Sequence, residues 1–380
     1  MIQFNSISRK KIIKEILHQE GCPSSYNKYA ESIPQNIPLE AFADHNSQST
    51  LLPGVGGKNP EEIISSVNKA ALRKAVIKTI KEKLFSENLP YIHLAYYPNG
   101  FRTVVTLRID CDETNQIDFD RVLYYADLNS IPLTWFIDMK YLQSYLPYIA
   151  SIRERGHDIQ LHCYEHETYE TYRQNKKNIY QGKKLMEGNG IIVKGFASPF
   201  GKWNPSLNRA LEKLNFTFSS EFALAYDDLP FYPIIGNRFS KILQIPIHPV
   251  CIGLLRNAGF SRDEMKTYFE SIIREKFKQK DPIMLYGHPY KEIDQYPEVF
   301  DFILSYLKRF PDVWITTYRE FAFWWKKRLC ADFSIQIEND KAHIKTDNSN
   351  QSLLLRLEMP DGSETFLPLK NGSTLLTNLI

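Results

Sequence analysis

The hydrophobic residues between positions 91 and 330 follow two patterns that alternate along the chain. Short apolar runs, typical of buried strands, are each followed by a longer stretch in which apolar residues recur every three or four positions, as in an amphipathic helix. Regular alternation of this kind predicts an α/β fold with a parallel sheet, and about seven such units favour a closed or nearly closed barrel over an open sheet. The predicted strands are residues 104–109, 133–137, 159–161, 192–197, 216–219, 242–247, 283–286 and 313–316.

The pattern is different at the start of the chain. Residues 8–19 predict a short amphipathic helix, and residues 21–58, which are rich in Pro, Ser, Asn and Gln, predict extended structure. The apolar spacing of residues 59–85 is that of a second helix, with Asn59 as its N-cap and a proline at its first position. We therefore expect residues 1–90 to form a helical and extended N-terminal region.

The last fifty or so residues alternate apolar and polar side chains, as half-buried strands do. Asn339-Asp340 and Asp361-Gly362 have the composition of hairpin turns between these strands. Residues 331–380 are therefore expected to form a small all-β appendage that follows a barrel of residues 91–330. An appendage of this size needs to dock on the barrel to be stable.

Charge and cysteine content exclude several classes of protein. The net charge of +3 is too small to indicate a nucleic-acid partner. The five cysteines are odd in number and form no CxxC motif, so they do not indicate a disulfide framework. The N-terminus lacks the features of a signal peptide, and no run approaches the ~18 apolar residues of a membrane span. We expect a cytoplasmic protein without a membrane span.

Two histidines and an aspartate stand where predicted strands end. His162 and His166 are four residues apart, so both can reach one metal ion, and Asp112 would supply the third ligand. Solvated loop histidines are the alternative interpretation. The metal site is favoured because the carboxyl ends of parallel strands meet at one rim of a barrel. One carboxylate and two imidazoles leave positions open for water and substrate, which is typical of a catalytic site.

Two further residues fit the chemistry of hydrolysis. Asp110 shares a strand face with Asp112, so one carboxylate can bind the metal while the other takes a proton from water. His288 follows the predicted strand 283–286 and is placed to protonate a leaving amine. The pattern therefore predicts a metal-dependent hydrolase.

These residues lie in short motifs that resemble, in the same order, those of the polysaccharide deacetylase family, the NodB-homology domain of carbohydrate esterase family four. Asp110-Cys111-Asp112 looks like a variant first motif, in which the catalytic base and the metal aspartate are one residue apart. Residues 162–166 match the HxxxH metal motif of the family. Residues 198–201 resemble the third motif, and residues 285–288 resemble the last motif, whose histidine is the general acid.

The resemblance implies a distorted (β/α) barrel and a role for each of these residues. Asp110 would be the base and His288 the acid, with Asp112, His162 and His166 as metal ligands. The third motif would line the substrate groove and offer a backbone N–H to the oxyanion. The residues expected to contact substrate are Ser198, Pro199, Phe200, Gly201, Trp203 and His248.

The sequence departs from the family pattern at two places. The arginine that orients the base in the family is replaced by Ala197, and we predict that Arg108, two residues before Asp110 on the same strand face, takes over its role. The aspartate that usually supports the acid histidine is not evident. Glu221, Asp227 and Asp228 are the residues considered for it.

The predicted activity is removal of an N-acyl group, with acetyl expected, from an amino sugar of a surface-polysaccharide precursor. The substrate would be lipid-linked, nucleotide-linked or an oligosaccharide; the sequence predicts no particular oligomer. Two alternatives stay open: hydrolysis of another non-peptide amide, in a formamido sugar or a cyclic imide, and an inactive carbohydrate-binding relative. Two histidines and one aspartate suit zinc, and cobalt or nickel would fit the same ligands.

Overall fold

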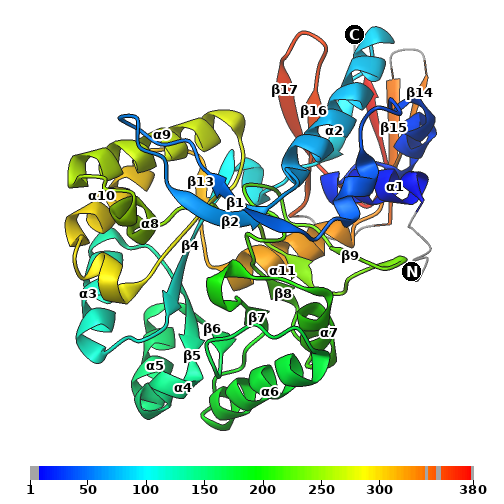
Figure 1. Ribbon diagram of the computed structural model, residues 1–380. Helices are drawn as coiled ribbons and strands as arrows, with labels where there is room; N and C mark the ends of the chain where they lie inside the picture. Colours follow the sequence, from blue (N-terminus) through cyan, green and yellow to red (C-terminus); the bar gives the residue numbers. More distant parts are fainter. Residues whose placement is uncertain (1–7, 339–340, 348–351, 378–380) are drawn as a thin grey trace.

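The computed structural model describes residues 8–338, 341–347 and 352–377 of the 380-residue chain. Its centre is a curved parallel sheet with the strand order β11-β8-β7-β6-β5-β4-β12, and β13 pairs with the first residues of β4 (Figure 1). This arrangement confirms the predicted α/β class and the distorted barrel. The strands are β4 (Thr103–Cys111), β5 (Thr134–Asp138), β6 (Asp158–Cys163), β7 (Gly195–Phe196), β8 (Phe218–Ser219), β11 (Leu243–Gln244), β12 (Ile283–Gly287) and β13 (Val313–Ile315).

One side of the barrel is irregular. β7, β8 and β11 have two residues each and are shorter than their apolar runs predict. Pro246 explains the early end of β11, because it has no backbone N–H to continue the ladder. The ring is joined after β11 by the backbone N–H of His248, which donates to the carbonyl of Met284 at 2.9 Å.

Helices cover the outside of this sheet (Figure 1). Their apolar faces pack on the strands, and buried side chains such as Phe119 and Trp135 fill the layer between. The 3₁₀ turn before β6 ends at Gly156, which adopts the left-handed conformation with φ 86°. The helices are α3 (Gln116–Asn129), α4 (Met139–Leu142), α5 (Leu146–Ile152), α6 (Tyr172–Gly188), α7 (Pro205–Lys213), α8 (Ile252–Asn257), α9 (Arg262–Gln279), α10 (Pro297–Leu307) and α11 (Tyr318–Leu329).

Short helical turns and one small hairpin connect these elements. The hairpin is formed by β9 (Ile234–Ile235) and β10 (Arg238–Phe239). A π-helical turn, η7 (Pro289–Ile293), follows β12 and shapes the rim of the barrel. The 3₁₀ turns are η3 (Pro98–Gly100), η4 (Gln143–Tyr145), η5 (Arg153–Arg155) and η6 (Pro199–Gly201).

The N-terminal region contains more regular structure than its composition indicates. Helix α1 (Arg9–Glu20) agrees with the prediction, but the stretch predicted to be extended includes the 3₁₀ turns η1 (Ser24–Ser32) and η2 (Leu39–Ala43). The prediction of a helix that starts at Asn59 is wrong for the first residues of that stretch. Residues 61–65 instead form the strand β2 (Glu61–Ser65), which pairs antiparallel with β1 (Ser47–Leu51).

The second helix, α2 (Lys69–Ser86), begins later than predicted. Its N-cap is Asn68, whose side chain accepts a hydrogen bond from the backbone N–H of Ala71 at 2.9 Å. The Asn59-Pro60 signal is local, and pairing with β1 overrides it. Figure 1 shows the β1–β2 hairpin lying between α1 and α2 on one side and α9 on the other.

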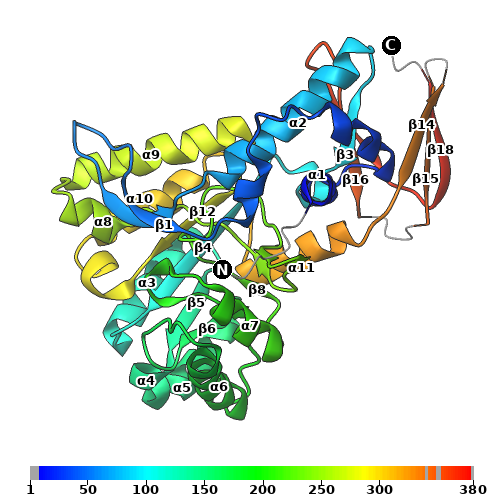
Figure 2. The ribbon, with the colours of Figure 1, turned by 45° about the vertical axis from the view of Figure 1, so that its right-hand side comes forward.

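The C-terminal strands form two antiparallel sheets, and the sheet that contains β3 lies beside α2 (Figure 2). One contains β14 (Ser334–Glu338), β15 (Lys341–Thr346) and β18 (Gly372–Thr377), and the other contains β16 (Leu354–Glu358), β17 (Glu364–Pro368) and β3 (Tyr91–Leu94). The first strand of the region assigned to the barrel is therefore shared with the C-terminal sheet. The division at residues 90 and 330 stays a prediction.

The predicted hairpin turns have different outcomes. Gly362, with φ 84°, lies between the paired strands β16 and β17 as predicted, whereas Asn339-Asp340 lies outside the described residues. Among the described helices, none combines the length and the apolar character that crossing a membrane requires.

Candidate functional site

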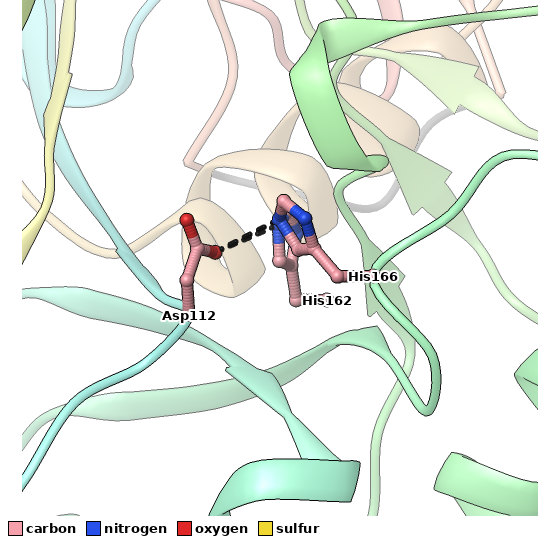
Figure 3. A group of neighbouring side chains, drawn as sticks. All are labelled: Asp112, His162 and His166. Atoms are coloured by element: carbon pink, nitrogen blue, oxygen red, sulfur yellow. Dashed lines mark hydrogen bonds and ion pairs between the residues drawn. The ribbon is translucent and has the colours of Figure 1, made fainter.

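The three predicted metal ligands meet at the rim formed by the carboxyl ends of the strands (Figure 3). Asp112 follows β4, His162 lies in β6, and His166 lies in the loop after β6. Oδ1 of Asp112 is 3.3 Å from Nε2 of His162 and 3.1 Å from Nε2 of His166. The two Nε2 atoms are 3.2 Å apart. These three side chains therefore offer converging ligand atoms that all lie within 4.8 Å of one another.

The chemistry of this donor set fits a divalent cation. Nδ1 of His162 lies 2.7 Å from the carbonyl of Ala197, so it carries the proton and donates, which leaves the lone pair of Nε2 directed toward Asp112. Oδ1 of Asp112 is buried, and no donor in the described part of the chain gives it a well-aligned hydrogen bond. Burial raises the pKa of Asp112, but the two imidazoles outweigh it and hold the pKa well below its usual range.

A side chain from helix α6 fixes the loop that carries His166. Oδ1 of Asn178 accepts hydrogen bonds from the backbone N–H groups of Tyr164 and Glu165, at 3.2 and 2.6 Å. Its Nδ2 donates to the carbonyls of Glu165 and Glu167 at 2.8 and 3.1 Å. The HxxxH spacing indicated the ligand pair but not this clamp, because a lone Asn in a helix carries no sequence signal.

Arg108 and Asp110 form a buried, two-pronged ion pair. Nε and Nη2 of Arg108 donate to the two carboxylate oxygens of Asp110 at 2.6 and 2.5 Å, and Nη1 donates to the carbonyl of Ser220 at 2.6 Å. The guanidinium lies over the rings of Phe136 and Tyr286, 5.2 and 5.7 Å from their centroids. This geometry agrees with Arg108 as the residue that orients Asp110, although the catalytic roles of both stay predictions.

The electrostatics of Asp110 follow from this pairing. The side chain is 3% exposed, and burial alone would raise its pKa. The Arg108 guanidinium outweighs burial, so the pKa of Asp110 lies below its ordinary value. Asp110 is therefore ionised at neutral pH and able to accept a proton.

The carboxylate that supports His288 is Glu292, which we did not predict. Nδ1 of His288 lies 2.7 Å from Oε1 of Glu292, and Nε2 lies 3.9 Å from Oδ2 of Asp112. The backbone N–H of His288 also donates to Oε2 of Glu292 at 3.2 Å. Burial lowers the pKa of His288, but the Glu292 carboxylate outweighs it, so the pKa lies well above the ordinary value.

Glu292 occupies a cradle formed by small residues. Oε1 of Glu292 accepts a weak hydrogen bond from the thiol of Cys251 at 3.0 Å. A Cβ at Gly253 would lie 2.4 Å from the same oxygen, so any larger residue here would displace the Glu292 carboxylate. Glu292 is four residues after His288, and that spacing in the chain was the available signal.

The three acidic residues considered as the partner of His288 have other surroundings, so these predictions are wrong. Asp227 contacts Nδ1 of His248 and Nζ of Lys276, and Asp228 pairs with Arg73. Glu221 is fully buried, and burial raises its pKa to about 7, partly offset by Ser219 and Arg108. The sequence did not separate these acids because each follows a predicted strand.

A groove with a volume of about 390 Å³ opens beside the metal ligands. This volume is within the range of small-molecule sites. It is lined by Asp112, Glu113, Thr114, Asp138, Tyr141, His166, Phe200, Arg256, His288, Tyr290, Lys291 and Glu292.

Only one of the predicted substrate-binding residues lines this groove. Phe200 is 60% exposed and has φ 57°, so the tight turn pushes its ring outward against His166, with ring centroids 4.9 Å apart. Ser198, Pro199 and Gly201 are buried and support the turn, and their contact with substrate stays a prediction.

Trp203 and His248 are also absent from the residues that line the groove, and their contact with substrate stays a prediction. Trp203 is buried and packs on the ring of His45, with centroids 4.5 Å apart. His248 is 5% exposed, and both of its ring nitrogens contact side chains inside the protein. Nδ1 contacts Asp227, and Nε2 lies 2.9 Å from the hydroxyl of Tyr268. The sequence placed these residues after predicted strands, but that placement does not tell whether a side chain faces the groove or the core.

We expect Glu292 to control the acid function of His288. Replacing Glu292 by Gln should lower kcat about 10²-fold, because general acid catalysis contributes about 10²–10⁴-fold and the neutral amide no longer stabilises the imidazolium. Steady-state kinetics check this, with bound metal measured in parallel and expected to be unchanged. Glu298→Gln, on a half-exposed glutamate paired with Arg262, is the matched control. An unaltered kcat in Glu292→Gln would remove the role.

This α/β barrel carries one carboxylate and two imidazoles at the carboxyl ends of its strands, which is a ligand set typical of a catalytic metal site. Residues 104–219 match the family described as "Polysaccharide deacetylase". This part of the chain therefore matches the family that its motifs predicted; the variant form of the first motif stays a prediction.

Individual proteins show more distant similarity. The chain is 24% identical over 131 residues to a peptidoglycan deacetylase of Helicobacter pylori, an alignment that spans 33% of this chain and 44% of that protein. A crystal structure from Mycobacterium smegmatis, described as a polysaccharide deacetylase, superposes with a TM-score of 0.53 and 17% identity over 65% of this chain and 98% of its own. The crystal structure of Puue allantoinase superposes with a TM-score of 0.52 and 18% identity, over 61% of this chain and 93% of its own. At these identities the two structures show the shared fold.

Proposed function

We propose that this protein is a divalent-metal-dependent hydrolase that removes an N-acyl group, with acetyl expected, from an amino sugar of a surface-polysaccharide precursor. The observation that carries the proposal is the convergence of Asp112, His162 and His166 beside a groove that also contains His288. The family match to residues 104–219 supports the hydrolase class. The cytoplasmic location and the choice of precursor stay predictions.

The residues of the chain divide the chemistry of amide hydrolysis between them. A divalent cation held by Asp112, His162 and His166 supplies Lewis-acid polarisation and lowers the pKa of water. Asp110, fixed in one orientation by Arg108, takes a proton from the attacking water as its oxygen bonds to the acyl carbon. His288, kept protonated by Glu292, gives its proton to the nitrogen as the carbon–nitrogen bond breaks. The products are a carboxylic acid and a free amine.

Zinc is the metal we propose, since the ligand set of two imidazoles and one carboxylate suits it. Cobalt and nickel accept the same ligands, so the test compares all three. The chelated protein is reloaded with one metal at a time, and the bound metal is counted by elemental analysis.

The direct test is release of acetate or formate from a panel of N-acyl sugars, with and without chelator. We expect release of acetate that stops on chelation and returns with one equivalent of metal. Formate release from N-formyl sugars, or ring opening of cyclic imides, would favour another amide as substrate. Stoichiometric metal without any hydrolysis, or no bound metal, would instead indicate an inactive carbohydrate-binding relative and contradict the proposal.

A further inference from the structure

One wall of the groove carries two cations without a carboxylate partner. Arg256 projects from α8, and Lys291 from the π-helical turn after His288, and both line the groove. Arg256 is half-buried and Lys291 is exposed, and within residues 8–338, 341–347 and 352–377 neither forms an ion pair. An unpaired cation at a ligand groove is available to a ligand anion.

The protein holds the guanidinium of Arg256 in place, whereas the side chain of Lys291 is exposed at the edge of the groove. Nη1 of Arg256 donates to the carbonyl of Lys291, and Nε and Nη2 donate to Oδ1 of Asn257 at 3.2 and 2.9 Å. Lys291 has φ 61°, which L residues rarely adopt, and its Nζ lies 4.9 Å from the centre of the Tyr290 ring. These contacts fix the wall and still leave N–H groups of Arg256 free to bind a ligand.

The other groove residues indicate what lies between this wall and the metal ligands. Phe200, Tyr141 and Tyr290 are 60%, 50% and 39% exposed, and such rings provide faces for a sugar. A neutral sugar gives the two cations no partner. Glu113 also lines the groove, after β4, and would repel an anion, so an anion is directed to the wall of Arg256 and Lys291.

We propose that Arg256 and Lys291 bind an anionic group, a phosphate or a carboxylate, that the amino-sugar substrate itself carries. The identification of the sugar rests on the proposed function, whereas the anion site rests on the two unpaired cations. An arginine fork beside a lysine suits the oxygen atoms of either anion. The substrate class is therefore an acidic N-acyl amino sugar.

The first experiment measures binding and needs no turnover. The metal-loaded protein is titrated calorimetrically with glucosamine, glucosamine 1-phosphate, glucosamine 6-phosphate and muramic acid, which carries a carboxylate. At least one anionic sugar should bind about 10- to 100-fold more tightly than glucosamine, as expected for charge-assisted hydrogen bonds. Which one does so separates phosphate from carboxylate. Equal affinity for all four would overturn the proposal.

Variants assign the effect to the two side chains. Arg256→Gln and Lys291→Gln should each lose most of the preference for the anionic sugar while the affinity for glucosamine is kept. Lys291→Gln is the safer variant, because Arg256 also holds the turn. Lys140→Gln, on a half-exposed lysine 3.8 Å from Glu165 and outside the groove, is the matched control and should keep the preference. A preference that survives both groove variants contradicts the proposal.

Turnover separates this inference from the proposed function. With N-acetyl forms of the same sugars, kcat/KM should be higher for the anionic substrate, and Lys291→Gln should reduce only that value. Hydrolysis with no anion preference would retain the proposed function and reject the inference. Anion-dependent binding without hydrolysis of any substrate would retain the inference and reject the proposed function.

Discussion

Replacing His162 by Ala should abolish stoichiometric metal binding and lower kcat/KM by on the order of 10³-fold. Lewis-acid stabilisation by a metal contributes several kcal/mol, and each 1.4 kcal/mol is about a factor of ten in rate. His162 is the best-fixed ligand of the three, because it is 2% exposed and its Nδ1 is committed to the carbonyl of Ala197. Its Nε2 therefore has one orientation, and no exposed side chain can substitute for it.

Elemental analysis and steady-state kinetics, run on the same preparation, check this expectation. His18→Ala is the matched control, because His18 is exposed near the end of α1 and far from the metal ligands in sequence. It should bind one equivalent of metal and keep the parental rate. Full metal content in His162→Ala would show that the cation lies elsewhere. Loss of metal with an unchanged rate would show that hydrolysis does not depend on the metal.

The ligand set was predictable because it depends on topology and short spacing. Asp112 follows one apolar run, and His162 ends another, so a parallel sheet brings them to the same rim whatever the details of the loops. His166 is four residues from His162 and needs only a tight turn. Arg108 was predictable for a similar reason, since side chains two apart on a strand share a face.

The partner of His288 was not predictable by the same argument. Its support comes from a π-helical turn, which has no sequence signature, and from a cradle that Gly253 keeps open. The surroundings of His248 were not predictable either, because its ring contacts Asp227 and Tyr268, which are distant in the sequence. Periodicity locates strand ends, but it does not say which side chain reaches solvent.

The N-terminal region shows where local signals lose to tertiary structure. Asn59-Pro60 has the chemistry of a helix start, yet the following residues pair with β1 as a strand. That hairpin is anchored by distant groups: Lys58 pairs with Glu264 at 2.6 Å, and the backbone N–H of Ser65 donates to the carbonyl of Phe222 at 3.1 Å. Such partners are remote in the chain, so no local window contains them.

Replacing Arg108 by Ala should cost about 3–5 kcal/mol of stability and at least 10²-fold in kcat, the loss typical of a missing precise electrostatic contact. Asp110 would be left buried without its two strongest donors, and Ser220 would lose a donor to its carbonyl. Arg121→Ala is the matched control, since Arg121 forms an ion pair with Asp118 at 3.1 Å and is 34% exposed. A pair of that kind contributes about 1 kcal/mol or less.

A second substitution separates stability from catalysis. In Arg108→Ala with Asp110→Asn, the uncompensated buried charge is gone, so urea unfolding should recover part of the lost stability. The rate should stay low, because an amide cannot accept the proton from water. If the double variant regains the rate, Asp110 is not the base. If Arg108→Ala alone unfolds at the parental urea concentration and keeps the parental kcat, the ion pair neither stabilises the barrel nor orients the base.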